Sequence, residues 1–149
     1  MENAVIDSID SDILHTLQRN ARLTNRELGR LVGLSPNAAG ARVQRLQEKG
    51  IITGFTARIN HTALGRPMEV SIDVWQTDER NRAAFGELAA EDDRIVECFH
   101  LTGPLDFRVR ARVRSAEDLN DLLVSFQERG GVRQTDSRLV LEHLPTAGG

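Results

Sequence analysis

Cysteine is almost absent from this sequence, which has a single one, Cys98, among 149 residues. One cysteine cannot form a disulfide within the chain, and together with four scattered histidines it cannot form a zinc cluster. We interpret Cys98 as a small, buried apolar residue. Long apolar runs are also missing, since none approaches the length needed to span a bilayer.

The opening residues MENAVIDSID lack the basic region and the apolar region of a signal peptide. We therefore expect a cytoplasmic protein without a membrane partner. Patterns typical of enzymes are missing as well: there is no recognisable motif around a Ser or Cys nucleophile, no Gly-rich phosphate loop and no metal-ligand spacing. His100 is a lone histidine in an expected strand, where histidine is more often structural than catalytic. We predict neither enzymatic activity nor a bound cofactor.

Positive charge is concentrated in one part of the chain. Residues 13–60 contain eight Arg or Lys and two Glu, a net charge of +6, whereas residues 61–149 contain eleven Arg and sixteen acidic residues, a net charge of −5. A basic segment is where an anionic partner such as nucleic acid would bind. The asymmetry predicts two parts with different roles.

Capping residues mark the first two helices of the basic part. The first helix is predicted from a cap at Asp10 or Ser11 to about Asn20, because its apolar residues recur at helical spacing. The second helix is predicted over residues 25–32, because a T-x-x-E capping box precedes it and a glycine follows it.

A third helix follows the tight turn Gly33-Leu34-Ser35. Ser35 is its predicted cap, Pro36 occupies its first position and the helix runs to Lys49. Two short helices joined by such a turn are a helix-turn-helix signature, and the first helix completes their shared core. Gly40 in the middle of the third helix costs about 1 kcal/mol relative to alanine. It either allows close approach to DNA or has no role.

The solvent side of the third helix carries residues suited to DNA. When the N-terminal part of such a helix enters the major groove, Asn can pair with adenine and Arg with guanine or phosphate. Each arginine alone is more simply a solvated charge, but the capped helices and the basic segment together favour DNA contact. The predicted DNA-binding residues are Arg26, Ser35, Asn37, Ala38, Ala41, Arg42, Arg45 and Lys49.

The pattern then changes from helices to alternating strands and helices. Residues 51–60 are predicted as a trailing strand and residues 61–67 as a turn-rich linker. The elements predicted beyond the linker are strands at 68–76, 95–102, 107–113 and 132–144, a helix capped by Asp78 and running to Ala90, and a helix from Ser115 to about Arg129. This β-α-β-β-α-β order is the ferredoxin-like plan.

The predicted fold is therefore α+β with two domains. Residues 1–60 form a winged-helix-like helix-turn-helix domain with its trailing strand, and residues 68–149 form the ferredoxin-like domain. Val74 and the other β-branched residues of its first strand point to one face, so Trp75 points to the opposite face. A large aromatic residue there predicts a partner subunit covering it, and hence a homodimer.

Four runs of the sequence carry a family resemblance: IDSDILHTLQRNAR, ELGRLVGLSPNAAGARVQRLQEKGIITGFTARIN, IVECFHLTGPLDFRVRARV and GVRQTDSRLVLE. They resemble the leucine-responsive regulator/AsnC (Lrp/AsnC) family of transcriptional regulators over residues 9–142. The resemblance implies a winged helix-turn-helix and a ligand-sensing, oligomerising domain, often called RAM. It also implies dimers that assemble further, frequently into octamers, and small-molecule effectors that are usually amino acids.

The family's effector loop carries G-x-x-D between two strands, and the matching residues here are Gly103 and Asp106. The resemblance implies an effector bound between subunits, with loop N–H groups suiting a carboxylate and Asp106 suiting an ammonium group. Alternatively, both residues only make a β-turn. Pro104 departs from the polar residue usual in the family and removes one N–H from the loop. The predicted effector-binding residues are Leu101, Thr102, Gly103, Asp106, Ser137, Leu139 and Val140.

Two other functions stay open. Some proteins with this architecture resemble sirohaem decarboxylases, in which the sensing domain has become a catalytic pocket that uses His. Under this alternative, His100 and the arginines Arg108, Arg110 and Arg112 would belong to such a pocket. Alternating arginines more simply form an exposed edge or an interface face, and the basic third helix favours DNA. A sensor whose DNA-binding part is vestigial is the third alternative.

Overall fold

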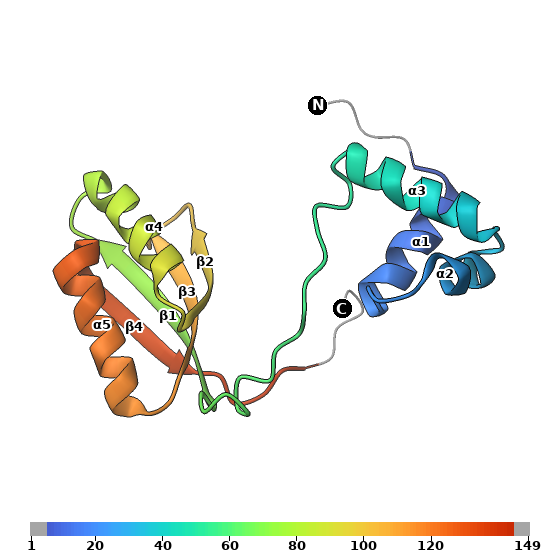
Figure 1. Ribbon diagram of the computed structural model, residues 1–149. Coiled ribbons are helices and arrows are strands. Elements are labelled where there is room, and N and C mark those ends of the chain that lie inside the picture. Colours follow the sequence, from blue (N-terminus) through green and yellow to red (C-terminus); the bar gives the residue numbers. More distant parts are fainter. Residues whose placement is uncertain (1–5, 145–149) are drawn as a thin grey trace. The chain divides into compact units, whose positions relative to one another are not determined.

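The computed structural model describes residues 6–144, and the chain divides into two compact units (Figure 1). The first unit ends at Arg58 and contains helices, and the second spans Ile59–Leu144 and contains a sheet with two helices. Within residues 6–144, no helix combines the length and the apolar character needed to cross a membrane.

The helices of the first unit are α1 (Ser8–Arg19), α2 (Asn25–Val32) and α3 (Pro36–Glu48). The prediction that Asp10 or Ser11 caps the first helix is wrong. Asp7 caps α1, because its carboxylate accepts a hydrogen bond from the N–H of Asp10 at 2.7 Å. Asp10 is instead the third helical residue of a capping box. The helix therefore starts a turn earlier than its apolar residues suggested.

The turn between α2 and α3 has the predicted caps. Thr24 and Glu27 form the capping box, and Ser35 caps α3 by accepting from the N–H of Ala38. Gly33 ends α2 with a φ of 73°, in the left-handed region that glycine adopts most readily. These local interactions satisfy helix-end N–H groups and fix the turn.

A small apolar core joins the three helices. Its buried members are Ile13, Leu17, Leu28, Ala39 and Leu46. Burying a large aliphatic side chain contributes about 1.5–3 kcal/mol, so this core, rather than intrinsic propensity, holds such short helices. Gly40 leaves room for the side chain of Asn25 in α2, since a Cβ there would lie 2.6 Å from the Asn25 Nδ2 atom.

The strand predicted over residues 51–60 is not formed. Ile51 and Ile52 pack partly against the helix core, but the segment forms no ladder with another described part of the chain. Phe55 and Ile59 are 51% and 53% exposed. The alternation of the sequence favoured an extended backbone, but a strand also needs a neighbour for its N–H and C=O groups.

The second unit is an antiparallel sheet with two helices on one face (Figure 1). Its strands are β1 (Met68–Gln76), β2 (Ile95–His100), β3 (Phe107–Val113) and β4 (Val132–Leu139), in the order β2-β3-β1-β4. The helices are α4 (Arg82–Glu91) and α5 (Ala116–Gly130). This topology confirms the ferredoxin-like prediction.

Three boundaries in this unit differ from the prediction. Asp78 caps a short 3₁₀ turn, Glu79–Asn81, and α4 begins only after it. The second strand ends at His100, which pairs with the first residue of β3, so the residues after it belong to the loop. The last strand ends at Leu139 and not at residue 144.

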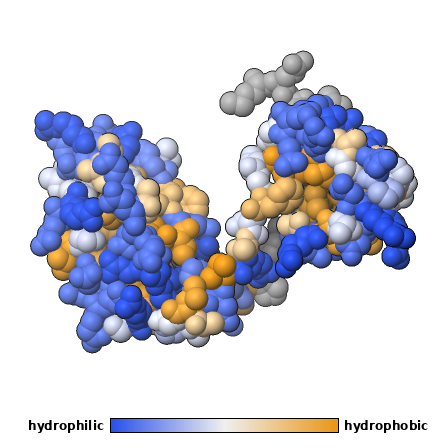
Figure 2. Space-filling model, viewed as in Figure 1, coloured by the Kyte–Doolittle hydropathy of each residue, from blue (hydrophilic) through white to orange (hydrophobic). Residues whose placement is uncertain are grey.

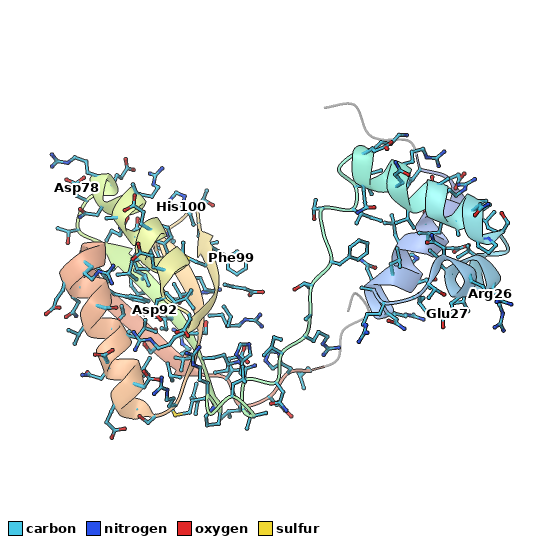
Figure 3. All side chains as sticks on the ribbon, in the orientation of Figure 1. Arg26, Glu27, Asp78, Asp92, Phe99 and His100 are labelled. Carbon is cyan, nitrogen blue, oxygen red and sulfur yellow. The ribbon has the colours of Figure 1, made fainter. Side chains whose placement is uncertain are left out.

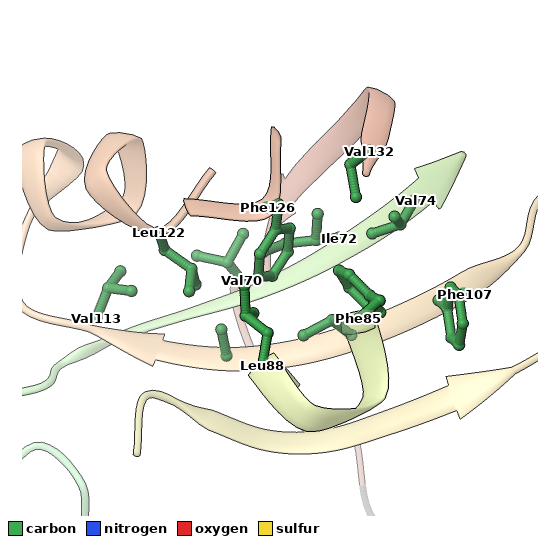
Figure 4. Close-up of a cluster of buried hydrophobic side chains, with 12 residues drawn as sticks. Val70, Ile72, Val74, Phe85, Leu88, Phe107, Val113, Leu122, Phe126 and Val132 are labelled. Atoms are coloured by element: carbon green, nitrogen blue, oxygen red, sulfur yellow. The ribbon is translucent and has the colours of Figure 1, made fainter. Parts of the chain in front are cut away.

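Aromatic and β-branched side chains fill the space between the sheet and the helices (Figure 4). Phe85 of α4 lies with its ring centroid 4.7 Å from that of Phe107 and 5.0 Å from that of Phe126. Val70, Ile72 and Val74 are at most 1% exposed, as predicted for the covered face of β1. The opposite face of the sheet carries no helix of this unit.

Candidate DNA-binding helix and effector loop

Helix α3 turns one side to the core of the first unit and the other to solvent. Ala39 and Leu46 are buried, whereas residues on the opposite side of the helix are open. Arg26 projects from α2 (Figure 3). The predicted DNA-binding residues that are exposed are Arg26, Ser35, Asn37, Ala41, Arg45 and Lys49. Ala38 and Arg42 are half-buried.

Gln44 was missed by the sequence reasoning. It lies on the exposed side of α3, seven residues after Asn37 and three after Ala41, and helical spacing places these three residues on one face. Its Nε2 donates to the Glu48 carboxylate at 2.9 Å. An amide side chain can read adenine, so the same periodicity that identified Asn37 and Ala41 would have found Gln44.

Arg42, like Arg45, differs from the other predicted contacts because its charge is already paired within the chain. Its Nη1 lies 2.6 Å from Asp7 Oδ2 and 2.9 Å from Asp10 Oδ1. The hydrogen bond from the Arg42 guanidinium, followed by that from the Asp10 N–H, holds the pKa of Asp7 below its ordinary value. The bonds to Asp7 and Asp10 likewise raise the pKa of Arg42. Arg42 therefore links α3 to α1 within the unit.

The predicted effector loop, residues 101–106, is tied to the end of β1. A hydrogen bond from the Leu101 N–H to the Asp106 carbonyl, at 3.0 Å, closes the two ends of the loop. The Asp106 N–H in turn donates to the carbonyl of Val74 in β1. Gly103 has a φ of 108°, a conformation that favours glycine. Asp106 Oδ2 accepts from the Gln76 N–H at 2.7 Å. Gly103 and Asp106 thus have structural roles in the turn, and their role in ligand binding stays a prediction.

The other predicted effector residues lie on β4 or just after it, displaced along β1 from the loop. Ser137 pairs with Ile72 and Leu139 with Val70, whereas the loop is bonded to Val74 at the opposite end of β1. At about 3.3 Å per residue, Val70 and Val74 are ~13 Å apart along the strand. Val140 follows Leu139, farther still from the loop. Ser137, opposite Ile72, is about half as far from the loop along the strand.

A groove of about 400 Å³ lies between α4 and β2, beside the loop. Its lining includes Cys98, His100 and small residues of α4. The prediction that Cys98 is buried is wrong: it is exposed on an edge strand, because the small α4 residues opposite it leave the groove open. Partial burial there raises the pKa of the Cys98 thiol. Phe99 and His100 lie near the end of the same strand (Figure 3).

The uncovered face of the sheet carries a network of ion pairs. Asp73 is only 5% exposed and lies 2.7 Å from Arg108 Nε and 3.2 Å from Arg138 Nη1. Its hydrogen bond with Arg108 is the main cause that holds the pKa of Asp73 below its ordinary value. Glu69, 4% exposed, forms ion pairs with Arg110 and Arg112, and its Oε2 is hydrogen-bonded to His143 Nε2 at 2.8 Å.

These alternating arginines lie on an inner strand, so they line a face of the sheet and not its edge. Two of them pair with carboxylates of β1, whose register places Glu69 opposite Arg112 and Asp73 opposite Arg108. Arg110 pairs with Glu97 of β2 at 2.9 Å and lies 3.5 Å from Glu69. Trp75 follows on the same face and is half-buried. Figure 2 shows hydrophilic residues in blue over much of the visible surface of this unit. The arginines are committed to carboxylates and do not form a catalytic pocket.

Together the two units define a class, the helix-turn-helix regulators that carry a separate α+β domain. Residues 6–53 match the winged helix-turn-helix DNA-binding family, and residues 69–147 match the Lrp/AsnC ligand binding domain. The chain belongs to the Lrp/AsnC family of helix-turn-helix transcriptional regulators.

Relatives extend over nearly the whole chain. It is 32% identical over 149 residues to the leucine-responsive regulatory protein of Haemophilus influenzae, covering 95% of this chain and 87% of that protein. It is 31% identical over 144 residues to the transcriptional regulator AldR of Mycobacterium tuberculosis, covering 95% and 80%.

Solved structures agree with these relatives. A Neisseria meningitidis transcriptional regulator in complex with L-Met has a TM-score of 0.88 at 26% identity, covering 95% of this chain and 94% of that chain. AsnC of E. coli has a TM-score of 0.81 at 26% identity, covering 97% and 99%. The relatives are transcriptional regulators and not enzymes, which argues against the sirohaem-decarboxylase alternative. This chain is a DNA-binding transcriptional regulator with a ligand-binding domain.

Proposed function

We propose that the exposed side of α3 reads DNA sequence and that an amino acid bound between chains controls this binding. The observation that carries the proposal is the composition of that side: amide and guanidinium groups of Asn37, Gln44 and Arg45 on a helix whose other side is buried. Such a helix can enter the major groove without unfolding its own core. Arg26 and Lys49 flank it and suit phosphates.

A salt titration tests the phosphate contacts. Arg26→Ala should weaken binding to every duplex alike and lower the slope of log affinity against log salt by about one. Arg80→Ala is the matched control, because Arg80 lies in the second unit with 89% of its side chain exposed. If the slope of log affinity against log salt is the same for Arg26→Ala as for the control, Arg26 does not contact phosphate.

For the effector, we propose an α-amino acid at the loop of residues 101–106. The loop offers backbone N–H groups to a carboxylate, and the Asp106 carboxylate has lone pairs beyond the one that accepts from Gln76. The complex of the Neisseria relative with L-Met supports an amino acid as the class of ligand. Because Leu139 and Val140 lie at the end of the sheet away from the loop, we propose that they contact this ligand from a second chain.

We further propose that a second copy of the chain covers the uncovered face of the sheet. Half-buried Trp75 on that face suits contact with a partner more than open water. The resulting homodimer would assemble further into an octamer and act in the cytoplasm. Light scattering at micromolar concentration gives the mass directly, and a monomer would contradict this assembly.

A further inference from the structure

A buried carboxylate lies beneath the arginines of α3. Asp10 of α1 has 3% of its side chain exposed. It accepts from Arg45 Nη2 at 2.9 and 3.1 Å and from Arg42 Nη1 at 2.9 Å. Asp7 adds two further bonds to the same Arg42 nitrogen, at 2.6 and 2.8 Å. Two carboxylates of α1 therefore hold two guanidinium groups of the recognition helix.

Such an arrangement is unfavourable for simple attraction to DNA. A buried carboxylate must be paired to be tolerated, and a negative charge close to phosphates weakens non-specific binding. Free arginines would serve non-specific binding better. The ion pairs become useful when orientation matters, since an arginine that is already fixed loses less side-chain entropy on binding.

The two arginines are held differently. Arg42 has 24% of its side chain exposed and is bonded to both carboxylates, which makes it a link between helices. Arg45 has 46% exposed and is held through Nη2 alone, so its Nε and Nη1 groups remain for another partner. A guanidinium with free, oriented N–H groups is the geometry that reads guanine.

We propose that Asp10 is a positioning residue for sequence recognition, which holds Arg45 in the orientation in which that arginine contacts a base. Arg42 then serves mainly as the link between α1 and α3. The proposal rests on the proposed DNA-binding side of α3. If Asp10 only stabilised helix packing, its removal would lower stability without changing the preference for one DNA sequence.

The test compares Asp10→Asn with Asp12→Asn, which makes the same charge change at an exposed position of the same helix. The probes are a duplex enriched by the parent protein from a random library and a scrambled duplex of equal composition. We expect Asp10→Asn to lower the ratio of the two affinities about tenfold, within the range for a lost bidentate base contact. Asp12→Asn should leave the ratio unchanged.

A double variant shows whether the effect passes through Arg45. In an Arg45→Ala background, Asp10→Asn should cause no further loss of the ratio. A further loss as large as in the parent would overturn the proposal, as would an unchanged ratio in folded Asp10→Asn. If Asp10→Asn does not fold, Asp10→Glu keeps the charge but moves it by one methylene; a lowered ratio supports the proposal and a parental ratio overturns it.

The proposed DNA-binding side of α3 has its own readout. If Arg45→Ala and Asn37→Ala both keep the parental affinity and ratio, then α3 does not read the DNA, and the role of Asp10 falls with it. If Asn37→Ala lowers the ratio of the two affinities while Asp10→Asn does not, the proposal that α3 reads DNA is retained. Only the positioning role of Asp10 is then wrong.

Discussion

Replacing Asp106 separates its turn role from its proposed ligand role. Asp106 Oδ2 accepts from the Gln76 N–H at 2.7 Å, and Gln76 is only 8% exposed. Asn at this position keeps a side-chain oxygen for that N–H but loses the negative charge. Ala removes the acceptor and leaves a buried N–H without a partner.

The structure sets the size of each effect. Asp106→Asn replaces a charge-assisted hydrogen bond by a neutral one. We expect this to lower the free energy of unfolding by about 1 kcal/mol. Asp106→Ala leaves the Gln76 N–H unsatisfied and should cost about 1–3 kcal/mol. For a unit of this size, each kcal/mol lowers the midpoint of thermal unfolding by roughly 4–8 °C.

Calorimetry gives both readouts on the same samples. Thermal scans measure stability, and titration with L-Met as the probe measures ligand binding, with Asp121→Asn as a control that removes a carboxylate charge on α5, away from the loop and from the uncovered face of the sheet. We expect Asp106→Asn to stay folded and lose L-Met binding, and the control to keep it. Full ligand affinity in Asp106→Asn would show that the carboxylate serves only the turn.

Two further predictions concern the second unit. Phe85→Ala should cost about 3–5 kcal/mol in urea unfolding, because Phe85 is fully buried between Phe107 and Phe126; a loss below about 1 kcal/mol would mean that the core is organised differently. The pKa of Asp73 is lowered in the folded chain, so its contribution to stability is present above its unfolded pKa and is lost as pH falls below about 4. The difference in unfolding temperature between the parent and Asp73→Asn should therefore shrink on acidification, and a difference independent of pH would refute this role.

Local interactions explain why the helices could be predicted from the sequence. The caps that fix the helix-turn-helix involve residues within four positions of each other: Thr24 with Glu27, and Ser35 with the helix that follows. A short stretch of sequence is therefore enough to predict this turn. The period-2 pattern of β1 and the glycine of the 101–106 loop are local in the same way. The start of α1 shows where such local prediction fails. Spacing alone allows either Asp7 or Asp10 as the N-cap, and only the structure identifies Asp7.

The features that were missed depend on distant contacts. Asp10 and Arg42 are 32 residues apart, so no pattern in the sequence joins them into an ion pair. Cys98 is exposed because β2 is an edge strand, which follows from the order of strands and not from the residues around Cys98. Residues 51–60 have the alternation of a strand but no described neighbour. The effector residues predicted on β4 pair with Ile72 and Val70, whereas the loop is bonded to Val74, and this register follows from the sheet topology.

Sequence-specific binding by α3 is the central claim, and fluorescence anisotropy with two duplexes tests it most directly. One duplex is the DNA upstream of the protein's own coding sequence, and the other is a scrambled duplex of equal length and composition at the same salt. We predict that the parent binds the upstream duplex at least about a thousandfold more tightly, and that Asn37→Ala loses much of this preference. Equal affinities of the parent for the two duplexes would contradict the account.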